Sequence, residues 1–116
     1  MGVSVGGYLW SLGLTLLIEA PVYGAGLARL LGVRVLPGVV AGVTVNVITH
    51  PLSFLLIVPV LQPRIGYWPA LAVVEVSVWP AEALMLCAWL RRDLGTLLGL
   101  SFVANGLSLG IGLLMY

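Results

Sequence analysis

The chain has 116 residues, of which 61% are hydrophobic and 8% charged, with a formal net charge of +1. A soluble domain carries about 25% charged residues, so this composition excludes a water-soluble globule and makes the lipid bilayer the expected solvent. The same shortage of charge leaves no basic patch for nucleic acid.

Long apolar segments separated by short arginine-bearing turns predict four transmembrane helices, over residues 8–31, 36–61, 68–90 and 94–115. Each segment has about 20 residues or more, enough at about 1.5 Å per residue to cross a hydrocarbon core about 30 Å thick. Helices are favoured over strands because a backbone in lipid must satisfy its own hydrogen bonds, and the segments lack alternation. The predicted fold class is therefore an all-α membrane protein, a four-transmembrane-helix bundle in a single membrane domain, residues 1–116.

The distribution of arginines predicts the orientation of the helices. The turns after the first and third helices carry Arg29, Arg34, Arg91 and Arg92, whereas the middle turn carries Arg64. Because cytoplasmic loops are enriched in basic residues, we expect the first and third turns inside and both termini outside. The outer interface would then hold the aromatic residues Tyr8, Trp10, Tyr67, Trp68 and Tyr116.

Short matches between the two halves predict an internal repeat of residues 8–61 and 68–115. The matches are IEAPVY (Ile18–Tyr23) with VEVSVW (Val74–Trp79) and VNVIT (Val45–Thr49) with ANGLS (Ala104–Ser108). Chance similarity between apolar helices is the alternative explanation.

A repeat of two helices would have a geometric consequence. Two helices return the chain to its starting side, so the halves would be parallel and related by a pseudo-twofold axis along the membrane normal. This axis would place Glu19 and Glu75, together with Asn46 and Asn105, around a shared centre.

Polar motifs follow one another in the predicted helices. They are Glu-x-Pro in the first, Asn-x-x-Thr-His-Pro in the second, two glutamates in the third and Asn-x-x-Ser in the fourth, at Glu19, Pro21, Asn46, Thr49, His50, Pro51, Glu75, Glu82, Asn105 and Ser108. This order resembles that of uncharacterised small bacterial four-helix integral membrane proteins. The resemblance covers essentially the whole chain. It implies the four-helix fold and a bacterial cytoplasmic membrane, and it brings no assigned activity.

Three glutamates lie inside the predicted helices. Counted from the nearest cytoplasmic arginine, Glu19 is about 15 Å and Glu82 about 14 Å into the membrane, and Glu75 about 24 Å. An ionised group at the bilayer centre costs about 2.5–3.5 kcal/mol, so these carboxyls are expected to face the bundle, with at least one protonated near pH 7. They would either bind protons or cations, or donate structural hydrogen bonds between helices.

Glu82 is the strongest single candidate for a proton or cation site. Glu75, Trp79 and Glu82 share one face of the third helix, where two like charges favour a shared proton or a bound cation. Glu82 is the deeper of the two glutamates and has no sequence counterpart in the first helix.

The second helix carries Asn46 and His50 one turn apart. Gly38 and Gly42 continue this face, and small residues at this spacing let another helix approach closely. Asn46 is therefore expected to face protein, as an interhelical hydrogen-bonding group or as part of a site. His50 has the estimated height of Glu75, so a hydrogen bond between them is expected, with a proton relay or a metal ligand as alternatives.

The fourth helix carries Asn105 about 20 Å from the cytoplasmic arginines, where an interhelical role like that of Asn46 is expected. Gly106 and Gly110 follow at GxxxG spacing, which suits tight packing within the bundle or between copies. Small residues also recur in the first helix, at Ala20, Gly24 and Ala28.

Pro21, Pro51 and Pro80 lie inside predicted helices and are expected to kink them. Each proline lacks an amide donor and leaves the carbonyl four residues earlier unpaired, at Leu17, Val47 and Val76. These carbonyls would coordinate a cation or water, or be satisfied by the hydroxyls of Thr49 and Ser77 or by water.

The sequence contains no nucleotide-binding loop, zinc-protease motif or hydrolase motif, so an enzyme is the less favoured class. We expect a transport or permeation protein that acts as a homo-oligomer and uses the glutamates as proton or cation sites. The alternative is an accessory or structural subunit of a larger membrane complex. A metal site formed by Glu75, Glu82 and His50 is least favoured, since one histidine without a cysteine pair is a poor ligand set. The sequence identifies no cofactor.

Overall fold

The computed structural model describes residues 5–115, apart from the side chains of Val5, Tyr8 and Met115. Over this range the chain is helical: α1 (Val5–Leu31), α2 (Val35–Pro51), the π-helix η1 (Leu52–Ile57), α3 (Val58–Ile65), α4 (Tyr67–Leu90) and α5 (Leu94–Met115). Four stretches are long and apolar enough to cross a membrane: Leu9–Leu31, Val35–Ile65, Tyr67–Leu90 and Leu94–Leu114. The prediction of four apolar membrane-length helices is confirmed, and the second runs on to Ile65 instead of ending at residue 61.

The second stretch is a continuous helix with a widened segment directly after Pro51. Because Pro51 lacks an amide hydrogen, it disturbs the regular bonding of the helix, and the chain adopts π-helical geometry over the next six residues. The Ser53 hydroxyl donates to the Thr49 carbonyl within this segment, at 2.8 Å. Pro21 and Pro80, by contrast, lie within α1 and α4 without ending either helix.

The hydroxyls expected to satisfy the carbonyls freed by the prolines have other partners. Ser77 donates to the Val73 carbonyl at 2.8 Å, and Thr49 donates to Glu82. That expectation was therefore wrong for both residues.

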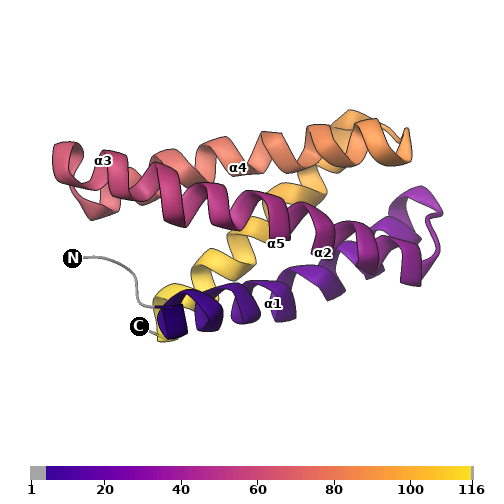
Figure 1. Ribbon diagram of the computed structural model, residues 1–116. Helices are drawn as coiled ribbons and strands as arrows, with labels where there is room; N and C mark the ends of the chain where they lie inside the picture. The colour runs from indigo at the N-terminus through magenta and orange to yellow at the C-terminus, as the bar shows by residue number, and fades with distance from the viewer. Residues whose placement is uncertain (1–4, 116) are drawn as a thin grey trace.

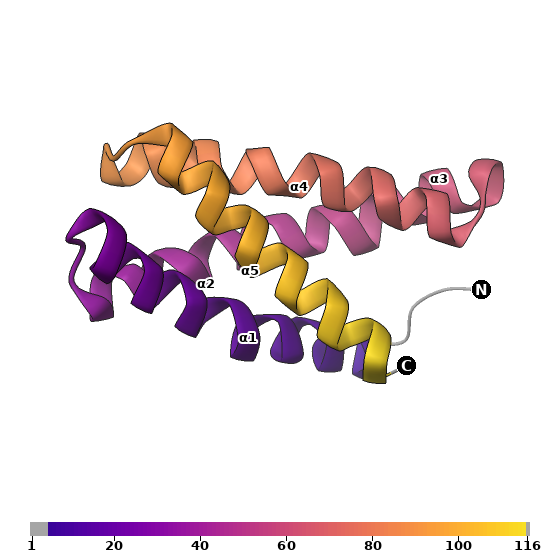
Figure 2. The same cartoon turned by 180° about the vertical axis from the view of Figure 1, so that it is seen from behind.

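Two helices exchange partners along the length of the molecule (Figure 1). The α2 helix starts beside α1 and continues through η1 and α3 along α4. Conversely, α5 starts beside α4 and crosses to α1 (Figure 2). The turns that follow α1 and α4 lie at one end, and α1 begins and α5 ends at the other. The two arginine-rich turns therefore share an end, whose assignment to the cytoplasmic side stays a prediction.

The arginine end is closed by a packed apolar core. Its members are Tyr23, Leu27, Val33, Ala41, Val45, Ala83, Leu86, Leu97, Leu100 and Ala104. Helices α1 and α2 come close here because glycines face each other: a Cβ built on Gly38 would lie 3.4 Å from the Gly24 Cα atom. The expected role of these glycines in close helix packing is confirmed.

The turns at this end are joined and capped by polar groups. The Arg92 Nε atom donates to the Leu31 carbonyl at 3.2 Å and so links the two turns. At the start of α5 the Asp93 carboxylate accepts bonds from the Thr96 amide (2.9 Å) and hydroxyl (2.8 Å), which is N-capping geometry. These bonds hold the pKa of the exposed Asp93 carboxyl below its usual value.

Gly106 and Gly110 of α5 do not pack against other described residues of the chain. A Cβ built on Gly106 or Gly110 would meet no described atom within 4 Å, and both residues are exposed. Of the two roles expected for this GxxxG spacing, packing within the bundle is therefore wrong among the described residues.

Candidate functional site: a one-sided cavity ending at buried carboxyls

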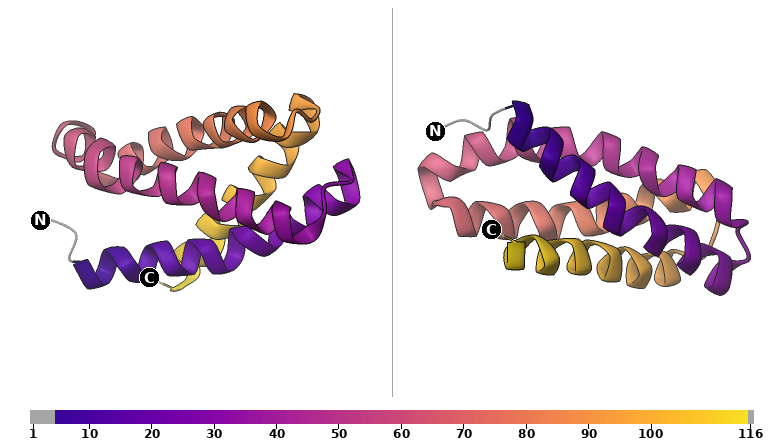
Figure 3. Two further views of the ribbon diagram at one scale, coloured as in Figure 1. Left: turned by 45° about the vertical axis from the view of Figure 1, so that its right-hand side comes forward. Right: turned by 90° about the horizontal axis from the view of Figure 1, so that it is seen from below.

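The half of the molecule that holds the start of α1 and the end of α5 contains a partly open cavity of about 370 Å³. The described residues that line it lie within 7–19, 46–82 and 105–113. The segments between these ranges supply the apolar core at the arginine end. The cavity therefore occupies one half of the molecule and stops near its middle, between helices that Figure 3 shows from two further directions.

Glu82 lies at the inner end of this cavity and is 0% exposed. Its Oε1 atom accepts hydrogen bonds from the Tyr23 hydroxyl (2.7 Å) and the Asn105 amide nitrogen (3.1 Å), and its Oε2 atom accepts one from the Thr49 hydroxyl (2.7 Å). Both carboxyl oxygens act as acceptors from neutral donors, an arrangement that suits an ionised carboxylate.

Glu19 is 1% exposed and has fewer partners than Glu82. Its Oε2 atom is 2.6 Å from the Ser108 hydroxyl, and the Asn46 side chain forms a weaker hydrogen-bonding contact with the same carboxyl. The Ser108 hydroxyl also lies 3.1 Å from the Asn105 carbonyl. A protonated Glu19 would donate to Ser108, and Ser108 would donate to that carbonyl, so this geometry suits a neutral carboxyl.

The two buried glutamates are bound reciprocally across the halves of the chain. Glu19 contacts Ser108 from the second half, and Glu82 contacts Thr49 from the first. These hydroxyls are the last residues of the two Asn-x-x-Ser/Thr motifs. The sequence interpretation paired Glu19 with Glu75 and left Glu82 without a counterpart, whereas the hydrogen bonds give Glu19 and Glu82 the matching positions.

The two asparagines also occupy similar environments. Asn46 donates to the Gly42 carbonyl at 2.8 Å, and Asn105 donates to the Ser101 carbonyl at 2.9 Å, each four residues back in its own helix. Asn105 contacts Glu82 as well, so it joins α5 to α4. The expected interhelical role is thus observed for Asn105, and the Asn46 side chain likewise contacts Glu19 on α1. Both asparagines line the cavity.

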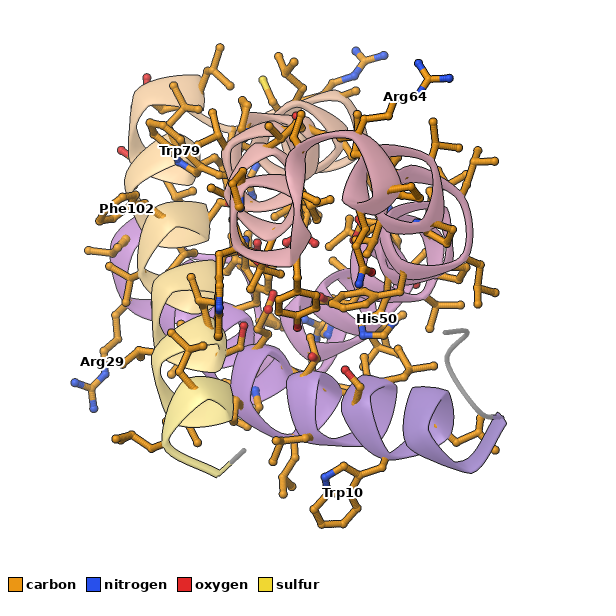
Figure 4. All side chains as sticks on the ribbon, turned by 90° about the vertical axis from the view of Figure 1, so that its left-hand side faces the viewer. Trp10, Arg29, His50, Arg64, Trp79 and Phe102 are labelled. Carbon is orange, nitrogen blue, oxygen red and sulfur yellow. The ribbon has the colours of Figure 1, made fainter. Side chains whose placement is uncertain are left out.

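His50 and Glu75 line the cavity but do not bind each other as expected. The His50 Nε2 atom is 3.3 Å from the Ser11 hydroxyl, and its ring stacks on Phe54 with centroids 4.6 Å apart. Figure 4 shows His50 pointing into the space between α1 and the helices above it. Glu75 is half-buried and lines the cavity, and no hydrogen bond from another described residue reaches its carboxyl.

The sequence interpretation missed Tyr23 as part of the site. Tyr23 is 0% exposed and lies between the carboxyl cluster and the apolar core, with its hydroxyl on Glu82 and 3.1 Å from Ser101. A usable signal was its position four residues after Glu19, which places both side chains on one face of the helix.

Trp79 was expected beside Glu75 and Glu82, but it faces α5. Its indole nitrogen donates to the Leu98 carbonyl at 2.7 Å, and its ring forms a T-shaped pair with Phe102, with centroids 5.5 Å apart (Figure 4). Trp79 therefore fastens α4 to α5 outside the cavity.

Within residues 5–115, no group of three or more His, Cys, Asp or Glu side chains is arranged to hold a metal ion. Glu75, Glu82 and His50 line one cavity without converging on a common point of that kind. Comparisons of the chain with protein-family models, curated proteins and solved structures found no match.

Proposed function

We propose that this protein transports protons or small cations across a membrane, with Glu19 and Glu82 as the central exchange site. The observation that carries the proposal is the position of this carboxyl pair at the blind end of a one-sided cavity, in the middle of membrane-length helices. Among the described residues that line the cavity there is no arginine or lysine, so a bound cation or proton is the natural countercharge.

The unequal hydrogen bonding of the two carboxyls provides a route for proton exchange. Glu82 holds a negative charge with help from three neutral donors, and Glu19 holds a proton shared with Ser108. A monovalent cation entering the cavity would replace the proton on Glu19, and that proton would leave through the cavity to the solution. The two carboxyls would carry one net negative charge before and after the exchange.

Access from the arginine end requires a second conformation. Tyr23 and the apolar core close that side, so the helix pairs would have to separate there while the cavity closes. Rocking of one helix pair against the other around a fixed central site is the usual form of alternating access. The exchange of partners by α2 and α5 supports the predicted repeat and such a motion.

We place the protein in a bacterial cytoplasmic membrane with both termini outside, so the cavity would face outward. The exposed α5 glycines suit packing against a second copy, which supports a homo-oligomer. The same surface equally suits the alternative function, an accessory subunit docked on a larger membrane complex.

The test is cation and proton flux into liposomes that contain the purified protein. Glu82→Gln is expected to abolish flux because it removes the central charge while keeping the side chain's size. Ser77→Ala is the matched control on the same helix, since Ser77 is exposed and, among the residues that the structure describes, its hydroxyl bonds only to the Val73 carbonyl. Flux that is unchanged in Glu82→Gln, or absent in the wild-type protein, would refute the transport proposal. Native mass spectrometry would then show whether the chain copurifies with a partner.

A further inference from the structure

The cavity wall is mostly hydrocarbon. Apolar side chains from all four membrane-length stretches contribute to it, among them Leu14, Phe54, Val58, Leu71, Val78 and Leu109. Its volume of about 370 Å³ is in the range of pockets that enclose small organic molecules. A hydrated inorganic cation gains nothing from such a wall, because Ca²⁺ and Mg²⁺ prefer about six or more oxygen ligands.

The polar groups are concentrated on the carboxyl side of this wall. Glu75 lines the cavity without a hydrogen bond from the described residues, while Glu19 and Glu82 lie at its inner end. Glu19 and Glu82 are both buried, and the Asn46 side chain forms a hydrogen bond with Glu19. The half-buried Glu75 is therefore the carboxyl that a ligand in the cavity can reach.

We propose that the cavity binds an amphiphilic organic amine. The ammonium head would donate hydrogen bonds to the Glu75 carboxyl, on the side of the cavity where Glu19 and Glu82 are buried, and the hydrocarbon chain would lie along the apolar wall. An ammonium group has three donors and no acceptor, which complements a cluster of carboxyl oxygens. A carboxylic acid with the same chain would be repelled, and an alcohol would lack the charge.

This inference rests on the proposed function, because the amine would be the organic cation that the protein transports. It narrows the cation from an inorganic ion to a molecule with both a charged head and an apolar tail. Binding is nevertheless measurable without transport, so the two ideas can fail separately.

The experiment compares octylamine, octanol and octanoate at pH 7 with the protein in nanodiscs, using the ligand-dependent rise in thermal unfolding midpoint. The three probes share one chain and differ in the head, and an alkylamine is protonated at this pH. Octylamine is expected to bind about tenfold more tightly than octanol, as a charge-assisted hydrogen bond would produce, with octanoate weakest. Glu75→Gln should reduce this preference for the amine, because it removes a charge without removing a hydrogen bond of the fold.

Two variants test whether binding occurs in the cavity. Val78→Trp on α4 and Leu109→Trp on α5 each fill it from a different helix, so one suffices if the other fails to fold. Either variant should abolish the effect of octylamine. Equal effects of octylamine and octanol on the wild-type protein, or an undiminished effect in a folded filled variant, would overturn the inference.

The flux assay separates this inference from the proposed function. Flux that depends on Glu82 without amine binding would leave transport standing and refute the amine. Amine binding in the cavity without flux would support the ligand and refute transport.

Discussion

Replacing Tyr23 by phenylalanine tests whether Glu82 is charged. The substitution removes one hydroxyl, whose oxygen is 2.7 Å from Glu82 Oε1, and keeps a ring that is 0% exposed. A hydrogen bond to a charged group contributes about 1.5–3 kcal/mol, whereas a neutral bond contributes about 0.5–1.5 kcal/mol. Between membrane helices the measured average is about 0.6 kcal/mol. With an ionised Glu82, we expect Tyr23→Phe to lower the free energy of unfolding by about 2 kcal/mol.

The assay is reversible unfolding in mixed micelles, followed by tryptophan fluorescence and helical circular dichroism. A double-mutant cycle with Glu82→Gln isolates the interaction between the two side chains, and we expect a coupling of at least about 1.5 kcal/mol. Tyr67→Phe is the matched control, because no hydrogen bond to the Tyr67 hydroxyl is found within residues 5–115 and its ring is 43% exposed. It should change the stability by less than about 0.5 kcal/mol.

A coupling of about 0.6 kcal/mol would refute an ionised Glu82, because it is the value of an ordinary interhelical hydrogen bond. Glu82 would then be a neutral structural residue, and the unequal ionisation assigned to Glu19 and Glu82 would have no support.

Two further predictions concern packing and capping. Gly42→Ala should destabilise the protein by about 1–3 kcal/mol, because the new Cβ would lie 2.9 Å from the Tyr23 Cβ atom. Gly106→Ala should instead be neutral or stabilising by up to about 1 kcal/mol, because the new Cβ would meet no described atom within 4 Å. If unfolding titrations gave the same change in stability for Gly42→Ala and Gly106→Ala, the α1–α2 packing would be contradicted. Asp93→Ala should lower the thermal unfolding midpoint at pH 7, and the gap from wild type should narrow as the pH falls below 3.8, the usual pKa of Asp93. The sign follows because a carboxyl whose pKa is lowered by folding stabilises the protein above that usual value and loses this effect on protonation. A gap that is constant between pH 7 and pH 2 would contradict the role of the Asp93 charge.

The positions of the helices were predictable because they depend on local composition. The predicted spans 68–90 and 94–115 agree closely with α4 and α5, since arginines and glycines interrupt the apolar segments there. The π-helical segment after Pro51 was not predicted beyond a kink. The way in which a helix accommodates a proline depends on which neighbouring groups form hydrogen bonds with the backbone carbonyls that the proline leaves unpaired.

The partners of the polar residues were only partly predictable. Depth along each helix follows from residue counting, which gave Glu19 and Glu82 similar depths near the middle of their helices. The rotation of each helix and its neighbours do not follow from counting. As a result, Glu19 was paired with Glu75, and Tyr23 was overlooked.

The sequence by itself determined a chain of four apolar helices with buried carboxyls near their middle, because hydropathy and spacing act within one helix. Only the tertiary structure decided that α2 and α5 exchange partners, that Glu82 accepts hydrogen bonds from three donors, and that a cavity occupies one half of the molecule. The physical reason is that side-chain packing between helices sets their rotation and separation, and the apolar residues of this chain leave many such packings open when each helix is considered alone.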